Sequence, residues 1–395
     1  IKEIAQINKK DIIIMLVIML VYSFAAFYKL GSFKAPQTMF TSSASGESVV
    51  FELDENTNFN ILYYGGINYN SVNFSVSDDG VNFGENYPAE LNQSQIFRWK
   101  YLCQSYEDSE EKLTFNHTPL TLSGKYIKLS ADEAGVNIGE IIVREPSQNG
   151  IPGKLINIKP ISHEGQDSDF SSTPIEYLCD EQESLDGEPS YYNSTYFDEI
   201  YHARTGYEFV HGIRPYETSH PPLGKLFMSL GIMMFGMTPF GYRFFGVVAG
   251  IIMLPAIYIS AKYLFNSTKL ATSSCLLLAL DLMHLAQTRI ATIDSYPVLF
   301  ILLSFMFMLK YISLNHFAMS VEKTYAPLLL SGICFGLSVA SKWIGLYAGV
   351  GLAIMYFSSQ YVQIKAGKLA ESRLCDDSSE IEKEAADSYM YRFMQ

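Results

Sequence analysis

The chain has 395 residues, of which 28 are basic and 41 acidic, and this length allows two or three domains. Charge is divided unevenly, because residues 40–200 carry 27 acidic and 8 basic residues whereas the remainder carries 14 acidic and 20 basic ones. This division predicts an acidic, water-facing domain joined to a membrane part whose loops carry positive charge. No basic and aromatic segment typical of nucleic-acid binding is present, so no nucleic-acid partner is expected.

The first predicted element is a membrane-spanning helix at Ile12–Phe27, a nearly uninterrupted apolar run. The run approaches the ~20 residues that a spanning helix needs, and three lysines precede it. A cleaved signal peptide is the alternative, but no small-x-small cleavage site follows cleanly before Lys34. We therefore expect residues 1–34 to form a retained first helix, with the lysines inside and the chain beyond residue 31 outside.

An exterior β-sandwich is predicted for residues 35–150. This segment contains short β-branched or aromatic runs with partial alternation, which are typical of strands. The predicted strands are Val49–Leu53, Phe59–Tyr64, Val72–Val76, Tyr126–Leu129 and Ile138–Val143. A hairpin is expected to join Val72–Val76 to Val81–Phe83, because the intervening Asp79 and Gly80 supply the positive φ of a tight turn.

Two motifs of this segment carry a resemblance, Ser77-Asp-Asp-Gly-Val-Asn-Phe83 and the closing Ile138-Gly-Glu-Ile-Ile-Val143. The segment resembles a discoidin or galactose-binding-type jelly roll, which implies loops that bind carbohydrate or an acceptor. The alternative is a spacer that braces the following loop. Cys103 and Cys179 fall in the exterior region and could pair, although distance in sequence says nothing about distance in space.

Residues 151–237 are expected to contain an acidic linker, an exterior loop that carries the chemistry, and helices lying in the membrane interface. Ser194 or Thr195 can cap a helix whose first turn holds Asp198 and Glu199. Complementing the helix dipole is by itself a sufficient explanation for this acidic pair.

Five further spans are predicted in a bundle of residues 238–362, each from a long apolar run. They are Phe240–Phe265, Leu270–Thr288, Tyr296–Leu314, Tyr325–Ala340 and Trp343–Val362. The run Leu223–Met237 is short for a span and contains Lys225, so it predicts a helix lying in the interface. Counting crossings then puts the loop lysines inside, as the positive-inside rule expects, and leaves residues 363–395 as a cytoplasmic segment.

Ionisable residues in the predicted span Leu270–Thr288 point to a function, because such residues are costly in a bilayer and normally face a cavity or the bundle interior. Asp281, His284 and Thr288 share one face of this predicted helix. The crossing count leaves five ionisable residues near the outer face, namely Asp198, Arg243, Arg289, Asp294 and Lys342.

Five motifs, in order over residues 196–346, carry a second resemblance. They are Phe197-Asp-Glu199, His220-Pro-Pro-Leu223, Pro239-Phe-Gly-Tyr-Arg243, Ala279–Ser295 and Ser341-Lys-Trp-Ile-Gly-Leu346. Together they resemble the N-terminal half of the protein O-mannosyltransferase family of C-type glycosyltransferases. The resemblance implies a polytopic α-helical membrane protein with the N-terminal part of that fold and an inserted exterior β-sandwich (jelly-roll) domain. We expect a fragment of a longer protein, whose insertion leaves the acceptor open.

The resemblance also implies a catalytic site. Asp198 matches the family's catalytic carboxylate, Glu199 its acidic partner, and Arg243 an arginine important for activity. A lipid phosphate leaves without much protonation, so one carboxylate base for a Ser/Thr hydroxyl and cations on the phosphate suffice. Guanidinium forks match phosphate oxygens and Lys supplies a point charge, which makes Arg243, Arg289 and Lys342 the candidates for binding the donor phosphate.

Three further residues, His220, Asp294 and His202, are candidates for other contacts with the substrate. His220, which precedes two prolines, is expected to order its loop or touch the acceptor. The histidines follow no ligand spacing such as HExxH, and the cysteines show no CxxC spacing, so neither a metal nor another cofactor is expected.

These expectations predict a membrane glycosyltransferase that transfers a sugar, expected to be mannose, from a polyprenyl-phosphate donor to Ser/Thr of exported proteins. One alternative keeps this donor and changes the acceptor to a lipid or cell-wall glycan. The other is a non-enzymatic, membrane-anchored carbohydrate-binding protein, which the polar residues inside the spans disfavour. The expected location is the cell membrane, or the endoplasmic reticulum membrane in a eukaryote, with the active site on the exterior face and membrane lipids as neighbours.

Overall fold

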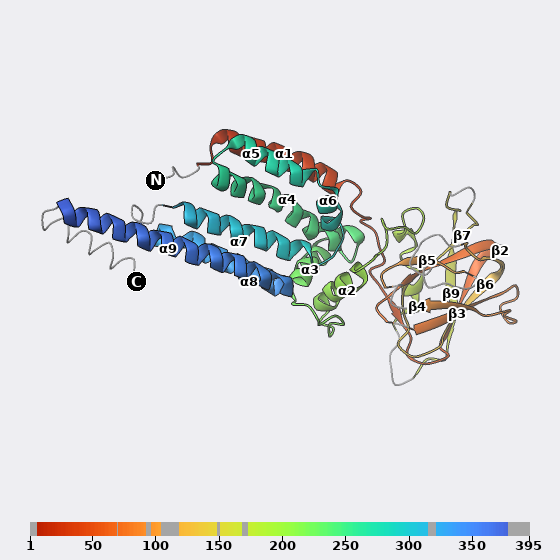
Figure 1. Cartoon of the computed structure of the whole chain (residues 1–395). Coiled ribbons are helices and arrows are strands. Elements are labelled where there is room, and N and C mark those ends of the chain that lie inside the picture. Colours follow the sequence, from red (N-terminus) through yellow and green to blue (C-terminus); the bar gives the residue numbers. More distant parts are fainter. Residues whose placement is uncertain are drawn as a thin grey trace.

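The computed structural model describes residues 6–68, 70–91, 96–103, 118–147, 151–167, 173–314 and 321–377. The molecule is elongated, with a bundle of helices at one end and an antiparallel sheet at the other (Figure 1). Helices α2 (Glu199–Val210) and α3 (Leu223–Phe235) lie at the end of the bundle that faces the sheet. The 13 residues of α3 are fewer than a spanning helix needs, and its expected place in the membrane interface stays a prediction.

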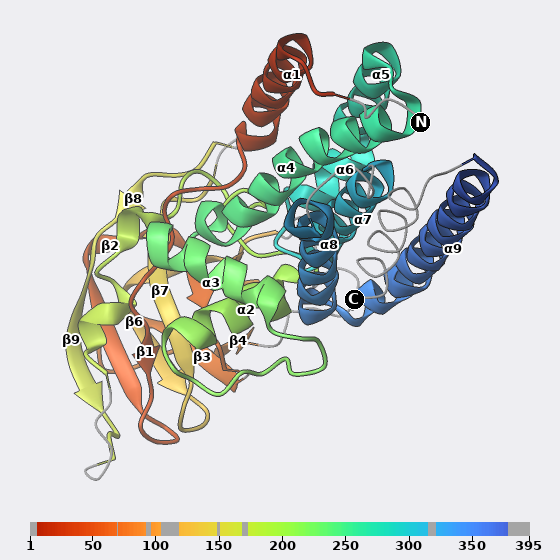
Figure 2. The same ribbon diagram turned by 90° about the vertical axis from the view of Figure 1, so that its left-hand side faces the viewer.

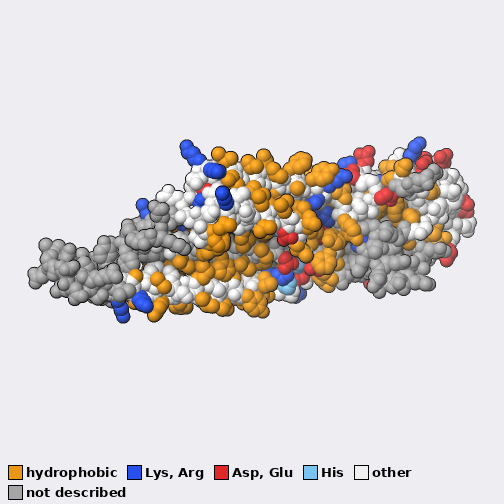
Figure 3. Space-filling view, turned by 45° about the horizontal axis from the view of Figure 1, so that its top comes forward, with side chains coloured by type: hydrophobic (Ala, Val, Ile, Leu, Met, Phe, Trp, Pro, Cys, Tyr) orange, Lys and Arg blue, Asp and Glu red, His pale blue; other side chains and the backbone are white. Residues whose placement is uncertain are grey.

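The bundle consists of helices with broad apolar surfaces. Their bounds are α1 (Lys9–Phe27), α4 (Pro239–Phe265), α5 (Thr268–Ala279), α6 (Leu282–Thr288), α7 (Ser295–Ser313), α8 (Val321–Ser341) and α9 (Leu346–Asp377). Among the described residues, α1, α4, α7 and most of α8 are long and apolar enough to cross a membrane, and α5 with α6 is a fifth candidate. Figure 3 shows apolar side chains covering the bundle, with Lys and Arg at the end away from the sheet. These helices support a location in a membrane.

Helix α9 is not among these candidates, although it holds most of the predicted span Trp343–Val362. Ser358, Ser359 and Gln360 interrupt its apolar stretch and lower its mean hydropathy. The composition of this helix therefore does not support a sixth span.

The predicted span Leu270–Thr288 is broken into α5 and α6, which meet at an angle of 58°. Asp281 lies at the break, is exposed, and accepts a hydrogen bond from the amide of Met283 at the start of α6. His284 and Thr288 are buried, and the ring of Tyr22 in α1 stacks on His284 with 5.4 Å between centroids. The expectation that all three polar residues face inward is wrong for Asp281, because it caps the second helix.

A buried polar cluster joins α1, α4 and α5 at the end of the bundle away from the sheet. Lys262 Nζ lies 3.1 Å from Asp11 Oδ2, and the hydroxyls of Tyr258 and Thr268 each donate to Asp11 Oδ1 at 2.8 Å. A buried charge is tolerated only when it is paired and hydrogen-bonded, as here. The cluster fixes α1 along α4, and thereby fixes where the C-terminal end of α1 lies.

The β domain, residues 40–164, is an antiparallel sheet that continues beyond residue 150, where the predicted sandwich ended. Its strands are β1 (Phe40–Thr41), β2 (Ser48–Gly65), β3 (Asn70–Ser77), β4 (Tyr87–Leu91), β5 (Trp99–Tyr101), β6 (Thr121–Ala131), β7 (Asn137–Arg144), β8 (Leu155–Ile156) and β9 (Ile158–Glu164). The main order is β1-β7-β2-β6-β3-β4; β5 and β9 also pair with β2, and β8 with β7. Because β9 pairs with β2, residues 158–164 belong to the sheet.

The predicted strands coincide with observed ones, with one difference. Val49–Leu53 and Phe59–Tyr64 form a single strand, β2, which bends at a register shift between them. Tyr126–Leu129 and Ile138–Val143 lie inside β6 and β7. The long strand β2 lets one segment contact four others.

The hairpin predicted after Val72–Val76 is confirmed, and Gly80 has the positive φ of 75° that its turn uses. Its second strand is β4 rather than Val81–Phe83. Asp79 Oδ1 accepts hydrogen bonds from the amides of Val81 and Asn82 and so holds this stretch in the turn.

Cys103 and Cys179 are both free thiols, and so the disulfide considered between them is not formed. Cys275 and Cys334 are buried thiols packed within the bundle.

The sheet and the helices share one apolar core. Leu62, Tyr64, Phe97 and Trp99 from the sheet region pack in the same cluster as residues of α2, α3 and α4. Figure 2 shows α2 and α3 lying against the sheet. The β domain is therefore packed on the segment that holds the acidic pair and is not a detached module.

Candidate active site

The centre of the site is an ion pair between Glu199, the first residue of α2, and Arg243 near the start of α4. Arg243 Nε donates to Glu199 Oε1 and Nη2 donates to Oε2, each at 2.7 Å. The two residues are 0% and 3% exposed. This two-pronged geometry is specific, and removing either partner would leave the other charge buried and unpaired.

The same ion pair also binds the main chain of three other segments. Arg243 donates to the carbonyl oxygens of Leu30 at 3.0 Å and Ser194 at 3.1 Å. Glu199 accepts from the amide of Ala291 at 2.9 Å. The ion pair therefore ties the segment after α1, the loop before α2 and the loop after α6 to α4.

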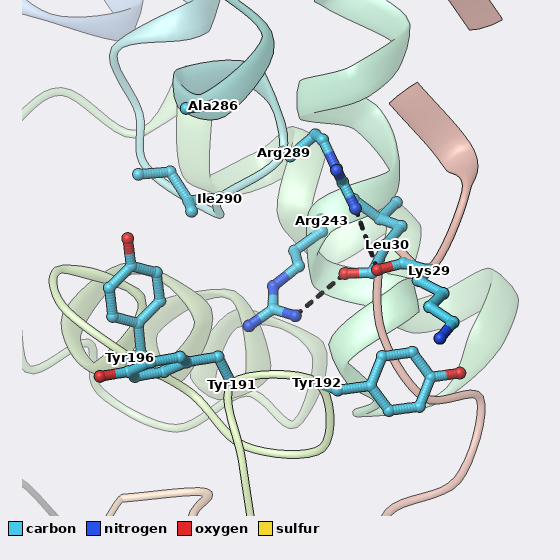
Figure 4. A pocket seen from close by; sticks show the side chains of 9 residues that line it. All are labelled: Lys29, Leu30, Tyr191, Tyr192, Tyr196, Arg243, Ala286, Arg289 and Ile290. Carbon is cyan, nitrogen blue, oxygen red and sulfur yellow. Dashed lines mark hydrogen bonds between the residues drawn. The ribbon is translucent and has the colours of Figure 1, made fainter. Parts of the chain in front are cut away.

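A pocket of about 630 Å³ opens beside this ion pair, and we call it the basic pocket (Figure 4). It is lined by Lys29, Leu30, Tyr191, Tyr192, Tyr196, Arg243, Ala286, Arg289 and Ile290. Three of these described residues carry a positive charge and none carries a carboxylate. The pocket therefore suits an anionic ligand of small-molecule size.

Arg289 crosses one side of the basic pocket toward the end of α1 (Figure 4). Its Nη2 donates to the carbonyl oxygens of Tyr28 at 2.8 Å and Lys29 at 3.0 Å. A guanidinium group carries five N–H donors, so donors on Nε and Nη1 are left without partners among the described residues. Arg289 can bind an anion while it keeps its contacts to the main chain.

Asp198 has surroundings different from those of its neighbour Glu199. It occupies the N-cap position of α2, is half-buried, and makes no capping hydrogen bond with its side chain. Burial raises the pKa of its carboxyl above the ordinary value; Asp294 raises this pKa further, whereas Lys342 and His220 lower it. A reachable carboxylate with a raised pKa is suited to accept a proton as a general base.

Lys342 and Asp294 form an ion pair beside Asp198, with 2.6 Å between Lys342 Nζ and Asp294 Oδ1. Lys342 follows α8, whereas Asp294 occupies the N-cap position of α7. The pair therefore joins the loop after α6 to the turn after α8.

His220 and His202 lie face to face, with 6.2 Å between ring centroids. His202 is buried, and burial lowers the pKa of its imidazole to about 4, so this ring is neutral at physiological pH. The buried Lys225 donates to the carbonyl oxygens of His220 at 3.2 Å and Glu217 at 2.8 Å. These contacts fix the loop between α2 and α3, and a contact of His220 with the acceptor stays a prediction.

The structure divides the predicted phosphate-binding residues between two places. Arg243 and Arg289 line the basic pocket, whereas Lys342 pairs with Asp294. The chain connects the two places closely, because Tyr196 lines the basic pocket two positions before Asp198, and Ile290 lines it four positions before Asp294.

Neither Ser194 nor Thr195 caps α2, contrary to the prediction. Ser194 Oγ accepts from the amide of Trp99 at 3.1 Å, and the hydroxyl of Thr195 donates to the carbonyl oxygen of Ile96. The two side chains bind the β domain instead.

Sequence reasoning missed Lys29, Tyr191 and Tyr192 as parts of the pocket. Lys29 resembles a cation flanking a membrane span, and its approach to Arg289 depends on tertiary structure. The tyrosine pair was a usable signal, since it stands in a polar segment next to the acidic motif.

No group of three or more His, Cys, Asp and Glu residues in the described part of the chain is placed to hold a metal ion. The expectation of no metal and no other cofactor stays a prediction.

Comparison with known proteins shows where the chain is similar to others. Residues 235–372 match the family model described as dolichyl-phosphate-mannose-protein mannosyltransferase. The polyprenol-phosphate-mannose--protein mannosyltransferase of Mycolicibacterium smegmatis (strain MKD8) is 25% identical over 190 residues, which are 43% of this chain and 37% of that protein. The enzyme of the same name from Corynebacterium glutamicum is 28% identical over 143 residues, 32% of this chain and 28% of its own length.

A eukaryotic relative is also similar. Dolichyl-phosphate-mannose--protein mannosyltransferase 1 of Saccharomyces cerevisiae is 23% identical over 172 residues, covering 39% of this chain and 21% of the yeast protein. The chain thus spans well under half the length of these relatives. The family model and the curated relatives together support the resemblance to the protein O-mannosyltransferase family that the motifs indicated.

Proposed function

We propose that the chain is part of a membrane glycosyltransferase that moves mannose from a polyprenyl-phosphate donor to Ser/Thr side chains of exported proteins. The observation that carries this proposal is the basic pocket at the end of an apolar bundle, whose lining includes Tyr196, two positions before Asp198 (Figure 4). The names of the relatives support the donor and the protein acceptor.

The first step assigned to this chain is proton acceptance by Asp198. Its carboxylate takes the proton of the acceptor hydroxyl while the hydroxyl oxygen forms a bond to the anomeric carbon of the sugar. Burial and the charge of Asp294 raise the pKa of Asp198 and so bring this pKa closer to the working pH. Glu199 has no such role in this proposal, because Arg243 holds both of its oxygens.

The second part of the proposal concerns the leaving group. As the bond between the anomeric carbon and the phosphate oxygen breaks, negative charge grows on the phosphate. Arg289, with Lys29, is assigned to stabilise that charge. Arg243 lines the same pocket, but its bonds to Glu199 make it chiefly a positioning residue that holds the loops in place.

Lys342 and Asp294 are proposed to tune the base rather than to hold the phosphate. Both act on the pKa of Asp198, in opposite directions, and each is the other's partner in an ion pair. His220 is proposed to contact the acceptor at the edge of this site, and the buried His202 to support its ring.

The orientation in the membrane is also part of the proposal. We place the lysine-rich end of the bundle inside and the β domain with the active site on the exterior face of a multi-pass membrane protein. The antiparallel sheet fits the expected galactose-binding-like jelly roll and the helices fit the C-type fold; both remain predictions. A lipid or cell-wall glycan acceptor is the second candidate, because the motifs that carry the family resemblance lie in residues 196–346 and the inserted β domain leaves the acceptor open.

The test is a transfer assay with the full-length protein in vesicles. Labelled polyprenyl-phosphate mannose would be supplied with a short Ser/Thr-rich peptide, and the label on the peptide measured. Label on the peptide is the expected result. Label that reaches only a co-supplied glycan or lipid would favour the second acceptor, and no transfer to any of them would overturn the proposal.

A further inference from the structure

One wall of the basic pocket comes from residues 185–196, which we call the tyrosine loop. Its Tyr191, Tyr192 and Tyr196 side chains face the arginines across the pocket (Figure 4). The rings of Tyr191 and Tyr196 lie 4.7 Å apart between centroids. Two of the three tyrosines are thus arranged as one aromatic surface.

The beginning of the tyrosine loop is held by Arg144, at the end of β7. Arg144 Nη1 donates to the carbonyl oxygen of Gly187 at 2.7 Å, and Nη2 to that of Leu185 at 3.2 Å. Arg144 is 9% exposed and Leu185 is buried in the core shared by sheet and helices. Charge-assisted bonds from a buried guanidinium to two carbonyls fix the main chain at this point.

A second anchor joins the middle of the tyrosine loop to β5. The hydroxyl of Tyr101 donates to Glu188 Oε2 at 2.6 Å. Just after it, the side chain of Asn193, which is 0% exposed, donates to the carbonyl oxygens of Asp186 and Glu188 at 3.1 and 2.8 Å. The loop is therefore held in a tight turn around Asn193.

The end of the tyrosine loop is bound to the segment that leads into β5. The amide of Thr195 donates to the carbonyl oxygen of Phe97 at 3.1 Å, in addition to the side-chain bonds of Ser194 and Thr195 to Trp99 and Ile96. Phe97 has a positive φ of 50° and packs its buried ring on Tyr207 of α2, 5.1 Å between centroids. A bulky residue keeps this backbone conformation only where its surroundings impose it.

The β domain thus binds the tyrosine loop before, within and after the turn that presents Tyr191 and Tyr192. On its other side the loop contacts the end of α1, since the amide of Ser32 donates to the carbonyl oxygen of Tyr192 at 2.8 Å. The inserted β domain therefore sets the position of the aromatic surface. The helix bundle sets the position of the positively charged residues that line the same pocket.

Resting on the proposed function, we propose that the β domain is a working part of the donor pocket, because it positions the tyrosine wall against the hexosyl phosphate of the lipid-linked sugar. Aromatic rings with hydroxyl groups suit a ligand that is apolar on one face and hydrogen-bonding at its edge, as a hexose ring is. Tyr101 and Arg144 are then positioning residues for donor use, although neither lines the pocket.

The test measures the donor KM, the peptide KM and kcat for the full-length protein in vesicles. Tyr101→Phe removes the hydroxyl that binds Glu188, a hydrogen bond to a charged group. Its loss is expected to raise the donor KM about tenfold while kcat and the peptide KM stay within about twofold. Arg144→Gln is expected to act in the same direction.

Tyr126→Phe is the matched control. The hydroxyl of Tyr126 donates to Glu52 at 3.3 Å within the sheet and touches no residue of the tyrosine loop. The same chemical change there is expected to leave all three kinetic quantities unchanged. An equal rise in donor KM for Tyr126→Phe would show a general effect of the β domain and overturn the assignment.

Binding of radiolabelled polyprenyl-phosphate mannose by the vesicles separates this inference from the proposed function. If the wild type transfers mannose but the Tyr101 and Arg144 variants keep a normal donor KM, or change the peptide KM alone, the inference is wrong and the function stands. If the wild type transfers nothing, the function is wrong. In that case weaker donor binding by Tyr101→Phe than by Tyr126→Phe would still support the inference that the β domain positions the tyrosines against the donor. Equal donor binding by the two variants would contradict this inference.

Discussion

Glu199 and Arg243 lie 44 positions apart in the chain and meet in two hydrogen bonds of 2.7 Å at the point where bundle and β domain join. Adjacent to Glu199, Asp198 makes no such bond. Two neighbouring carboxylates therefore have different surroundings, and in the proposed mechanism one holds the architecture while the other acts on a substrate.

The first prediction separates these tasks by stability. Glu199→Gln leaves the buried guanidinium of Arg243 without its counter-charge, and the expected loss is about 3–5 kcal/mol of the free energy of unfolding. Asp198→Asn, which removes no structural bond, is expected to change it by less than about 0.5 kcal/mol. Thermal unfolding of the detergent-solubilised variants would check both. Equal transition temperatures for the two variants would contradict the division.

The second prediction concerns the acid limb of the pH–rate profile. In the proposed mechanism Asp198 acts as a base, so activity should be lost as the pH falls through its pKa. Asp294→Asn removes a charge that raises this pKa, so the acid limb should move to lower pH. Lys342→Gln removes a charge that lowers it, so the limb should move to higher pH.

The profile of kcat/KM for the peptide is the quantity to measure, since it reports the free enzyme. Each substitution also removes the ion-pair partner of the remaining residue, Lys342 or Asp294. The proposed mechanism requires that the two substitutions shift the acid limb in opposite directions. Shifts in the same direction would mean that a different group controls the acid limb.

The third prediction concerns the donor phosphate. Arg289→Ala is expected to cost about 2–4 kcal/mol of transition-state stabilisation, whichever acceptor is used. Arg214→Ala is the matched control, because Arg214 is exposed and does not line the basic pocket. Rates with saturating peptide would show the difference, and similar rates for the two variants would remove Arg289 from the site.

The fourth prediction concerns orientation in the membrane. In a background without native cysteines, Glu133→Cys in the β domain should react with an impermeant thiol reagent added outside intact cells. Asn266→Cys, in the turn between α4 and α5, should react only after the membrane is opened. Both positions are exposed. Labelling of Asn266→Cys from outside would reverse the proposed orientation.

The sequence allowed much of this fold to be predicted, because apolar run length and strand alternation are local signals. The hairpin at Gly80 and the short apolar helix α3 follow from such signals. The break at Asp281 could not be found this way, because an apolar run of spanning length surrounds it.

The site was predictable only in part, for a similar reason. The motifs identified Asp198, Glu199 and Arg243, but not that Arg243 binds both oxygens of Glu199 while Lys342 binds Asp294. Pairing among charged groups is decided by tertiary contacts. The hydrogen bond between Ser194 and Trp99, 95 positions apart, could not be predicted for the same reason.

Transfer by Asp198→Asn is the measurement that tests the central claim most directly. The substitution keeps the shape of the side chain and removes proton acceptance, so mannose transfer to peptide should fall by about 10²-fold or more. Donor binding and the unfolding temperature should stay near those of the wild type. A correctly folded Asp198→Asn protein that transfers mannose at a near-normal rate would contradict the account.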